Sequence, residues 1–464
     1  MKRLFVLFFI LFIISNTYSA LRVPSFFSDN MVLQQNSEVK IFGEAIPNED
    51  VLLITSWNNK TIKVKSSNIG KWIVSIKTPR ADNCSYSLLI KQGRESICIN
   101  NIVFGEVWFC CGQSNMEMKM RGSFGQPILD GPQAIMNDQN KLLRICSVPK
   151  KYSCKELSDC NVLWKEADSE TIANCSAAAF FFGSQLQKVL KVPVGLIIAS
   201  WGGANIVSLM SKQSLEGFDN YNCELDDKLI KEPHLTPTVL FNSMVHPFLD
   251  YKIRGVIWYQ GECNRREPKL YKELFKAMVK DWRYKWGDSN LPFYYAQIAP
   301  FNYAEFNTAF MREAQFELEK EIKNVGMISL LDVGDENNIH PSNKKVVGNR
   351  FAQMALGRTY NMKGIATRSP RPISFKFFNG KAEICFDNRL TTYGKKIEQF
   401  MLAGRNQVFS PAKAEVHGNK VIVYSDKVNE PIAVRYGFVN FTKGTLYGIS
   451  GCLVSSFRSD NWEF

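Results

Sequence analysis

The chain has 464 residues, 45% of them hydrophobic, which is enough for two or three domains with well-formed cores. Its formal net charge is +13, from 57 basic and 44 acidic residues. The basic residues are scattered rather than interleaved with aromatic residues, so nucleic acid is not an expected partner; the surplus suits an acidic sugar or simply a solvated basic surface. The chain contains no Gly-x-Gly-x-x-Gly and no Walker sequence, which argues against nucleotide chemistry.

Residues 1–20 have the pattern of a secretory signal peptide. Met1 and two basic residues precede an unbroken apolar run at residues 4–14, and cleavage is expected after Ser19 or Ala20. No later stretch approaches the roughly 20 apolar residues of a membrane span. We therefore expect a soluble mature protein that is secreted or lies in a lumen such as the lysosome, with no membrane association after signal removal.

The cysteines and the glycosylation sequons agree with a secretory route. The chain has 12 cysteines, so disulfides are expected, and our preferred pairings are Cys84 with Cys98 and Cys385 with Cys452, since each pair stays within one predicted domain. There is no Cys-x-x-Cys pair and there are only four histidines, so we expect neither a metal nor a cofactor. Four Asn-x-Ser/Thr sequons are candidate glycan sites: Asn59, Asn83, Asn174 and Asn440.

The hydrophobic pattern divides the mature chain into three parts. Residues 21–100 show short alternating runs separated by turn residues, which predicts an N-terminal β domain. Residues 101–367 alternate apolar strands with helical stretches, which predicts an α/β domain with a mostly parallel sheet. Residues 368–464 return to the β pattern, and Asn379-Gly380 between two apolar runs is a strong hairpin signal, so a second β module is expected.

Five strands and one helix are predicted in the middle part. Between the third and fourth strands, apolar residues recur at helical spacing from Leu270 to Trp282, which predicts a crossover helix. The predicted strands are residues 102–109, 194–199, 256–259, 293–298 and 326–331.

Four of these strands end in polar or glycine-rich tips. Ser114 follows the first strand, Trp201-Gly-Gly-Ala-Asn205 the second, Gln260-Gly-Glu-Cys-Asn264 the third, and His340 ends the loop after the last. Parallel strands place such tips on one edge of the sheet. A serine, backbone N–H groups at a glycine pair, side-chain amides and a histidine are the parts that acyl transfer requires, so Ser114 is the candidate nucleophile and His340 its candidate base.

The sequence motifs at these four tips resemble those of the sialate O-acetylesterase family, a branch of the SGNH hydrolases. The resemblance covers nearly the whole mature chain and implies an SGNH-type fold and a metal-free serine mechanism that removes O-acetyl esters, typically from the glycerol side chain of sialic acids. The motifs at the tips are Gly112-Gln-Ser-Asn-Met116, Trp201-Gly-Gly203, Trp258-Tyr-Gln-Gly-Glu-Cys-Asn264 and Ile339-His-Pro-Ser-Asn-Lys344. Further motifs are Phe27-Ser-Asp-Asn-Met-Val-Leu-Gln34, Asp281-Trp-Arg283, Leu291-Pro-Phe293 and Arg312-Glu-Ala-Gln315.

The resemblance assigns roles to individual residues. Ser114 matches the nucleophile and His340 the base. With the N–H of Ser114, Gly203 and Asn264 match the oxyanion-hole positions, and Gln260 competes with Asn264 as the side-chain donor.

The acid is where this sequence departs from the family. SGNH enzymes generally carry an aspartate three residues before the histidine, but here that residue is Asn337. We expect Asp335 to orient His340; Asp332, or a backbone carbonyl in a Ser–His dyad, is the alternative.

Trp201, Trp258 and Glu262, at the same tips, are the candidate substrate contacts. The expected partner is an O-acetylated carbohydrate, and the oligomeric state is left open. Three other functions are compatible with the sequence. The chain could be an acetylesterase for other polysaccharides, since one fold hosts many esters. It could be a secreted glycan-binding protein whose site has decayed, or it could use thiol chemistry at Cys110 and Cys111.

Overall fold

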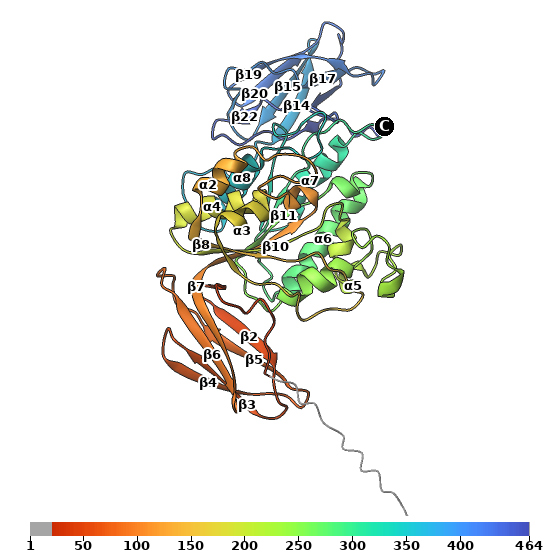
Figure 1. Cartoon of the computed structure of the whole chain (residues 1–464). Helices are drawn as coiled ribbons and strands as arrows, with labels where there is room; N and C mark the ends of the chain where they lie inside the picture. Colours follow the sequence, from red (N-terminus) through yellow and green to blue (C-terminus); the bar gives the residue numbers. More distant parts are fainter. Residues whose placement is uncertain (1–20, 464) are drawn as a thin grey trace, which may run out of the picture.

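The computed structural model describes residues 21–463, in which three parts follow one another in a row, with the N-terminal strands and the C-terminal strands at opposite ends (Figure 1). The predicted signal peptide lies outside the described residues. Within residues 21–463, no helix is long and apolar enough to cross a membrane.

The N-terminal strands form antiparallel pairs, apart from β1, which runs parallel to β7, and they lead into that one long strand, β7. The strands are β1 (Val32–Gln34), β2 (Glu38–Glu44), β3 (Asp50–Thr55), β4 (Lys60–Lys65), β5 (Lys71–Lys77), β6 (Tyr86–Gln92) and β7 (Glu95–Gly112). The first half of β7 pairs antiparallel with β6, and its second half, from Glu106, pairs in parallel with β10 and β11. Its exposure falls along this length, from a half-exposed start to a wholly buried end. One strand thus joins the N-terminal strands to the middle sheet and carries Ser114 just beyond its end.

The middle part is an α/β sheet with the strand order β13-β12-β11-β7-β10-β8-β9, parallel except for β9. Its remaining strands are β8 (Asn140–Ser147), β9 (Lys165–Ala167), β10 (Val194–Ser200), β11 (Gly255–Tyr259), β12 (Phe293–Ala296) and β13 (Val325–Ile328). β8 was not among the predicted strands. The α/β class predicted for this region is confirmed.

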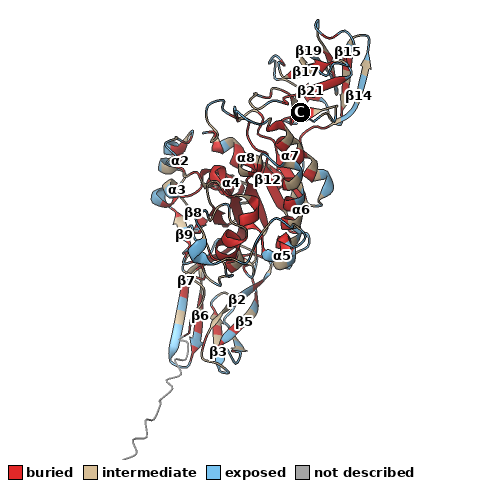
Figure 2. Ribbon diagram, turned by 90° about the vertical axis from the view of Figure 1, so that its right-hand side faces the viewer, coloured by how far each residue is buried: buried red, intermediate tan, exposed pale blue. Residues whose placement is uncertain are grey.

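Helices cover both faces of this sheet, so its strands are the most buried part of the molecule (Figure 2). Trp108 and Cys110 pack toward α4 and α8, whereas Phe109 and Cys111 pack toward α6, which is why β7 ends in a continuous apolar run. The α-helices are α1 (Ser114–Glu117), α2 (Gly131–Asn137), α3 (Ser169–Asn174), α4 (Ala177–Leu190), α5 (Lys212–Leu215), α6 (Pro268–Lys285), α7 (Ala309–Glu321) and α8 (Lys344–Arg358). The predicted crossover helix is α6.

Short helical turns fill the long connections of the middle part. They are η1 (Ile206–Leu209), η2 (Asp227–Leu229), η3 (Phe241–Val245), η4 (His246–Phe248) and η5 (Glu262–Asn264).

The C-terminal strands form small antiparallel sheets. The predicted hairpin joins β14 to β15: both Asn379 and Gly380 have positive φ, 45° and 74°, as a two-residue turn that follows the strand twist requires. The strands are β14 (Pro372–Phe378), β15 (Lys381–Phe386), β16 (Leu390–Thr391), β17 (Phe400–Ala403), β18 (Ser410–Pro411), β19 (Lys413–His417), β20 (Lys420–Tyr424), β21 (Ala433–Tyr436), β22 (Tyr447–Gly448) and β23 (Phe457–Arg458).

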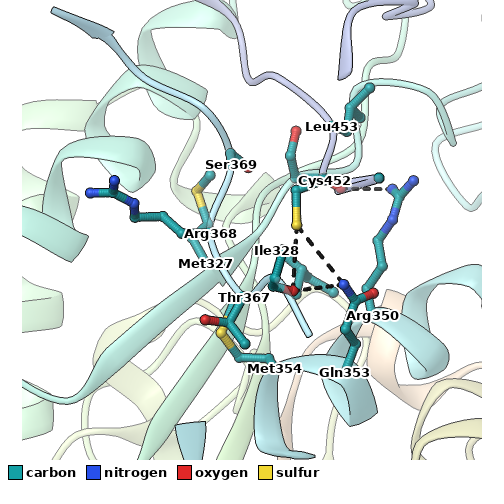
Figure 3. A pocket seen from close by; sticks show the side chains of 13 residues that line it. Met327, Ile328, Arg350, Gln353, Met354, Thr367, Arg368, Ser369, Cys452 and Leu453 are labelled. Atoms are coloured by element: carbon teal, nitrogen blue, oxygen red, sulfur yellow. Dashed lines mark hydrogen bonds between the residues drawn. The ribbon is translucent and has the colours of Figure 1, made fainter. Parts of the chain in front are cut away.

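All 12 cysteines lie in residues 21–463 and none of them forms a disulfide, so the two preferred pairings are wrong. Cys98 pairs across the β6–β7 ladder with Leu89, and Cys84 lies five residues before Leu89, a separation of about 15 Å along an extended chain that a disulfide does not span. The Sγ of Cys452 lines a cavity of about 40 Å³, where it accepts a hydrogen bond from the Nε2 of Gln353 at 3.9 Å (Figure 3).

Candidate active site

The turn after β7 holds Ser114 in a fixed place. β7 ends at Gly112, where an added Cβ would lie 2.1 Å from the carbonyl oxygen of Tyr259, so only glycine allows this approach to β11. The N–H of Gln113 donates to the same carbonyl at 3.0 Å, and α1 begins at Ser114. The N–H groups of a first helical turn have no partner within the helix, so this turn offers donors beside the Ser114 hydroxyl.

His340 meets Ser114 across 226 positions of sequence. Its Nε2 lies 2.9 Å from the Ser114 Oγ, and its own N–H donates to the Asn338 side chain at 2.7 Å. This loop reaches the nucleophile from the end of the sheet where β13 stops and immediately before α8 starts. The geometry is that of a hydroxyl and the base that takes its proton.

Burial lowers the pKa of His340 to about 4, and the nearby Lys344 ammonium acts in the same direction. The imidazole is therefore neutral over most of the pH range and its Nε2 can accept a proton. The activity-versus-pH profile of kcat/KM should stay flat as pH falls through 6 and should lose activity only near pH 4. A profile of acetate-ester hydrolysis checks this, and an acidic limb with its midpoint near the ordinary histidine value of about 6.5 would contradict it.

The structure does not bring Asp335 to His340. Among residues 21–463, no group hydrogen-bonds the buried Nδ1 of His340. The Asp335 carboxylate instead accepts the N–H of Asn337 at 2.9 Å and closes a local turn. Asp332 is held by both guanidinium nitrogens of Arg350, at 2.8 and 2.6 Å, because that cation on α8 is the stronger partner. The arrangement is a Ser–His pair without a carboxylate behind it.

Asp335→Asn is accordingly expected to keep a near-normal kcat, because the amide oxygen can still accept the Asn337 N–H. The comparison is with Asp332→Asn, which weakens the Arg350 pair and should lower the denaturation midpoint. Steady-state kinetics at equal folded fraction give the answer. A loss of about 10²-fold or more in kcat for Asp335→Asn alone would restore it as the orienting acid.

The second strand tip lies beside the nucleophile. A Cβ added at Gly202 would lie 3.6 Å from the Ser114 Cβ and 3.0 Å from a carboxylate oxygen of Glu117, which accepts the Gly202 N–H. The next residue, Gly203, has a φ of 77°, in the turn that closes when Ala204 donates to the Trp201 carbonyl at 3.1 Å. The positive φ favours glycine at this position, directly after the Gly202 that lies beside Ser114.

The hydrogen bonds at the third tip show how the two candidate amide donors, Gln260 and Asn264, differ. The Nε2 of Gln260 donates to the Ala204 carbonyl at 3.0 Å and to the Asn264 Oδ1 at 2.7 Å, so both of its hydrogens are used. The Nδ2 of Asn264 donates to Asn205 at 2.9 Å and has a second hydrogen left. Asn264 therefore keeps a donor that could serve an oxyanion, whereas Gln260 has none left and holds Asn264 in place.

Residues 104–357 match the model of a family described as carbohydrate esterase, sialic acid-specific acetylesterase. The chain belongs to this family. A carbohydrate acetylesterase from Xanthomonas citri has a similar structure, with a TM-score of 0.87 and 31% identity over 96% of this chain and 100% of that one. The sialate O-acetylesterase of Homo sapiens is 26% identical over 76% of this chain and 73% of its own length, and that of Mus musculus is 22% identical over 90% of each. The predicted family and enzyme class, a carboxylic ester hydrolase, are confirmed.

Two of the three candidate substrate contacts in this acetylesterase are buried. Trp258 is 0% exposed, because it faces α6 and packs against Trp282 and Phe293. Glu262 is 3% exposed and is bonded to Asn115 at 2.6 Å. Only Trp201 is partly exposed, with the Lys150 ammonium 5.6 Å from its ring.

Two features of the acetylesterase site do not follow from the predicted strand tips. Phe124 stacks on His340, with ring centroids 4.8 Å apart and planes at 20°. A buried network joins three tips: Asn115 accepts the Lys344 ammonium at 2.5 Å and donates to Glu262 and, at 3.2 Å, to the carbonyl of Ile339. The network was within reach, because Asn115 and Lys344 belong to the quoted motifs. Phe124 lies in a turn that no motif marks.

Thiol chemistry at Cys110 and Cys111 is contradicted by their surroundings. Both are 0% exposed within β7, and burial raises the pKa of each thiol far above its ordinary value. A thiolate is the reactive form, and neither residue supplies it. Within residues 21–463, no cluster of three His, Cys, Asp or Glu side chains has the arrangement of a metal site.

Proposed function

We propose that this protein removes O-acetyl groups from sialic acids, with 9-O-acetyl sialate as the substrate, through an acetyl-enzyme intermediate. The observation that carries the proposal is the 2.9 Å contact between the Ser114 Oγ and the His340 Nε2, in a chain that belongs to the sialic acid-specific acetylesterase family. Relatives named sialate O-acetylesterase support the choice of sugar.

In this mechanism, Ser114 attacks the acetyl carbonyl while His340 takes the hydroxyl proton. The N–H groups of Ser114 and Gly203 and the Nδ2 of Asn264 stabilise the oxyanion of the tetrahedral intermediate. The bond between the acetyl carbon and the sugar oxygen then breaks, His340 gives its proton to that oxygen so that the sugar leaves as an alcohol, and an acetyl ester remains on Ser114. A water molecule, deprotonated by His340, hydrolyses that ester and returns the enzyme to its first state.

We also propose a cellular location and a domain organisation for the protein. Residues 1–20 direct the chain to secretion or to a lysosomal or similar lumen, and the mature chain then consists of a β domain at 21–100, an SGNH-type hydrolase domain at 101–367 and a β module at 368–464. The described residues hold no disulfide, so the cysteines give this route no support, and it rests on the pattern of residues 1–20 and on the sequons.

A second candidate is an acetylesterase for other carbohydrates, favoured by the similarity to the Xanthomonas citri carbohydrate acetylesterase. The test compares hydrolysis of an aryl acetate, 9-O-acetyl sialic acid and an acetylated polysaccharide by the purified protein. Cleavage of the sialate ester supports the first candidate, and cleavage of the polysaccharide alone supports the second. Hydrolysis of none of the three would leave a glycan-binding protein with a decayed site. Mass spectrometry after a serine-directed organophosphate should find the adduct on Ser114.

A further inference from the structure

Phe124 lies beside the Ser114–His340 pair, in a tight turn. Ser123 and Gln126 exchange two main-chain hydrogen bonds, of 3.1 and 2.9 Å, and Phe124 lies between them with a φ of 56°. That conformation is uncommon for an aromatic residue, so an ordinary surface turn would favour glycine or asparagine here. The side chain is nevertheless 50% exposed and is not held by a hydrophobic core. A large apolar ring in a strained, open turn beside a reactive pair indicates a binding role.

The position of the ring relative to Ser114 is fixed by two observations. Its inner face lies on the imidazole of His340, 4.8 Å away and nearly parallel. Its Cζ lies 3.5 Å from the place where a Cβ on Gly202 would be, and the Ser114 Cβ lies 3.6 Å from the same place. The ring therefore borders the reacting hydroxyl on the His340 side, and it leaves an outer face and an edge free for substrate.

The chemistry of the proposed reaction decides which part of the substrate meets this ring. His340 must return its proton from Nε2 to the leaving alcohol, so the alcohol half of the ester lies on the His340 side of Ser114. The acetyl group points away, toward the donors at Ser114 and Gly203. The ring that covers His340 is consequently next to the alcohol, which in an acetylated sugar is the carbohydrate itself.

We infer that Phe124 is a substrate-binding residue that packs against the sugar half of the acetyl ester. The inference rests on the proposed function. The sugar lies on the outer face or edge of Phe124 while its ester oxygen reaches the Nε2 of His340. Apolar ring faces beside a few fixed polar groups are the usual lining of such ligand sites.

The test compares Phe124→Ala with the wild type on two substrates, 9-O-acetyl sialic acid and ethyl acetate, the second followed by titration of the released acid. Loss of the ring should raise KM for the sugar ester about 10-fold at pH 8, where His340 is neutral with or without the ring. At that pH the fall in kcat/KM should be about fivefold or more larger for the sugar ester than for ethyl acetate, which carries no ring. Phe124→Tyr, which keeps an aromatic ring, should have the wild-type KM for the sugar ester. Met136→Ala, which removes another exposed apolar side chain from the following helix, is the matched control.

An equal loss on both substrates at pH 8 would overturn the inference and make Phe124 a residue that positions His340. An unchanged KM for the sugar ester would overturn it as well. Wild-type cleavage of ethyl acetate without cleavage of the sialate ester would instead refute the proposed substrate. If the wild type turns over neither ester, binding of 9-O-acetyl sialic acid to Ser114→Ala, with and without Phe124→Ala, is measured by calorimetry, and equal affinities or no binding would count against Phe124.

Discussion

Replacement of Ser114 by alanine is expected to lower kcat for acetate-ester hydrolysis by about 10³-fold or more, because the residual rate would come only from the oxyanion donors and from binding. His340→Ala should be as damaging, since the base has no task without its nucleophile. The double variant should be no worse than either single one, because the two residues act as a unit. Steady-state kinetics on an aryl acetate, with circular dichroism to verify folding, measure all three.

The control for this series is Cys84→Ala, which changes an exposed thiol outside the site and should leave kcat unchanged. Two results would contradict the assignment. One is a Ser114→Ala protein that retains more than about a tenth of the wild-type kcat. The other is a wild-type enzyme that is inactivated by a thiol-selective alkylating agent and resists a serine-directed organophosphate.

The meeting of Ser114 and His340 could be predicted because each follows a strand of a parallel sheet. In such a sheet the carboxyl ends of the strands share one edge, so residues 226 positions apart become neighbours once the strands are recognised. Strand β8 escaped recognition because its buried run, from Leu143 to Cys146, is short and contains Arg144. That arginine is nevertheless 2% exposed and donates to main-chain oxygens, so a charged residue that suggests a surface position is in fact buried.

The acid and the substrate contacts could not be predicted for a different reason. Whether Asp335 contacts His340 depends on how the loop between them folds. The Asp335 carboxylate accepts the nearby N–H of Asn337 instead of a hydrogen bond from His340. Trp258 lies next to the last residue of β11, close to the third tip, but strand residues alternate between faces and this one faces α6. Phe124 owes its place to a positive φ, which no hydrophobic pattern reports.

Lys344→Met is expected to destabilise the protein by about 3 to 5 kcal/mol and to lower kcat, because it removes one charge from a buried network and leaves the other in place. Lys344 is 0% exposed, and burial lowers its pKa to about 7. Its ammonium holds the Asn115 side chain, which in turn holds Glu262 and the carbonyl next to His340. Loss of the lysine frees Asn115 and should loosen the alignment of Ser114 with His340.

Urea denaturation and a pH profile together separate the two effects of Lys344→Met. The ammonium disfavours a protonated imidazole, so its removal should raise the pKa of His340 and move the acidic limb of kcat/KM above the wild-type value of about 4. Glu262→Gln added to Lys344→Met should recover part of the lost stability, since it neutralises the carboxylate left unbalanced. The control is Lys345→Met, whose half-exposed ammonium pairs with Asp130 at 2.9 Å on the surface and should cost less than about 1 kcal/mol. Equal stability changes for Lys344→Met and Lys345→Met, or an acidic limb that stays in place, would show that the buried lysine neither braces the site nor acts on the base.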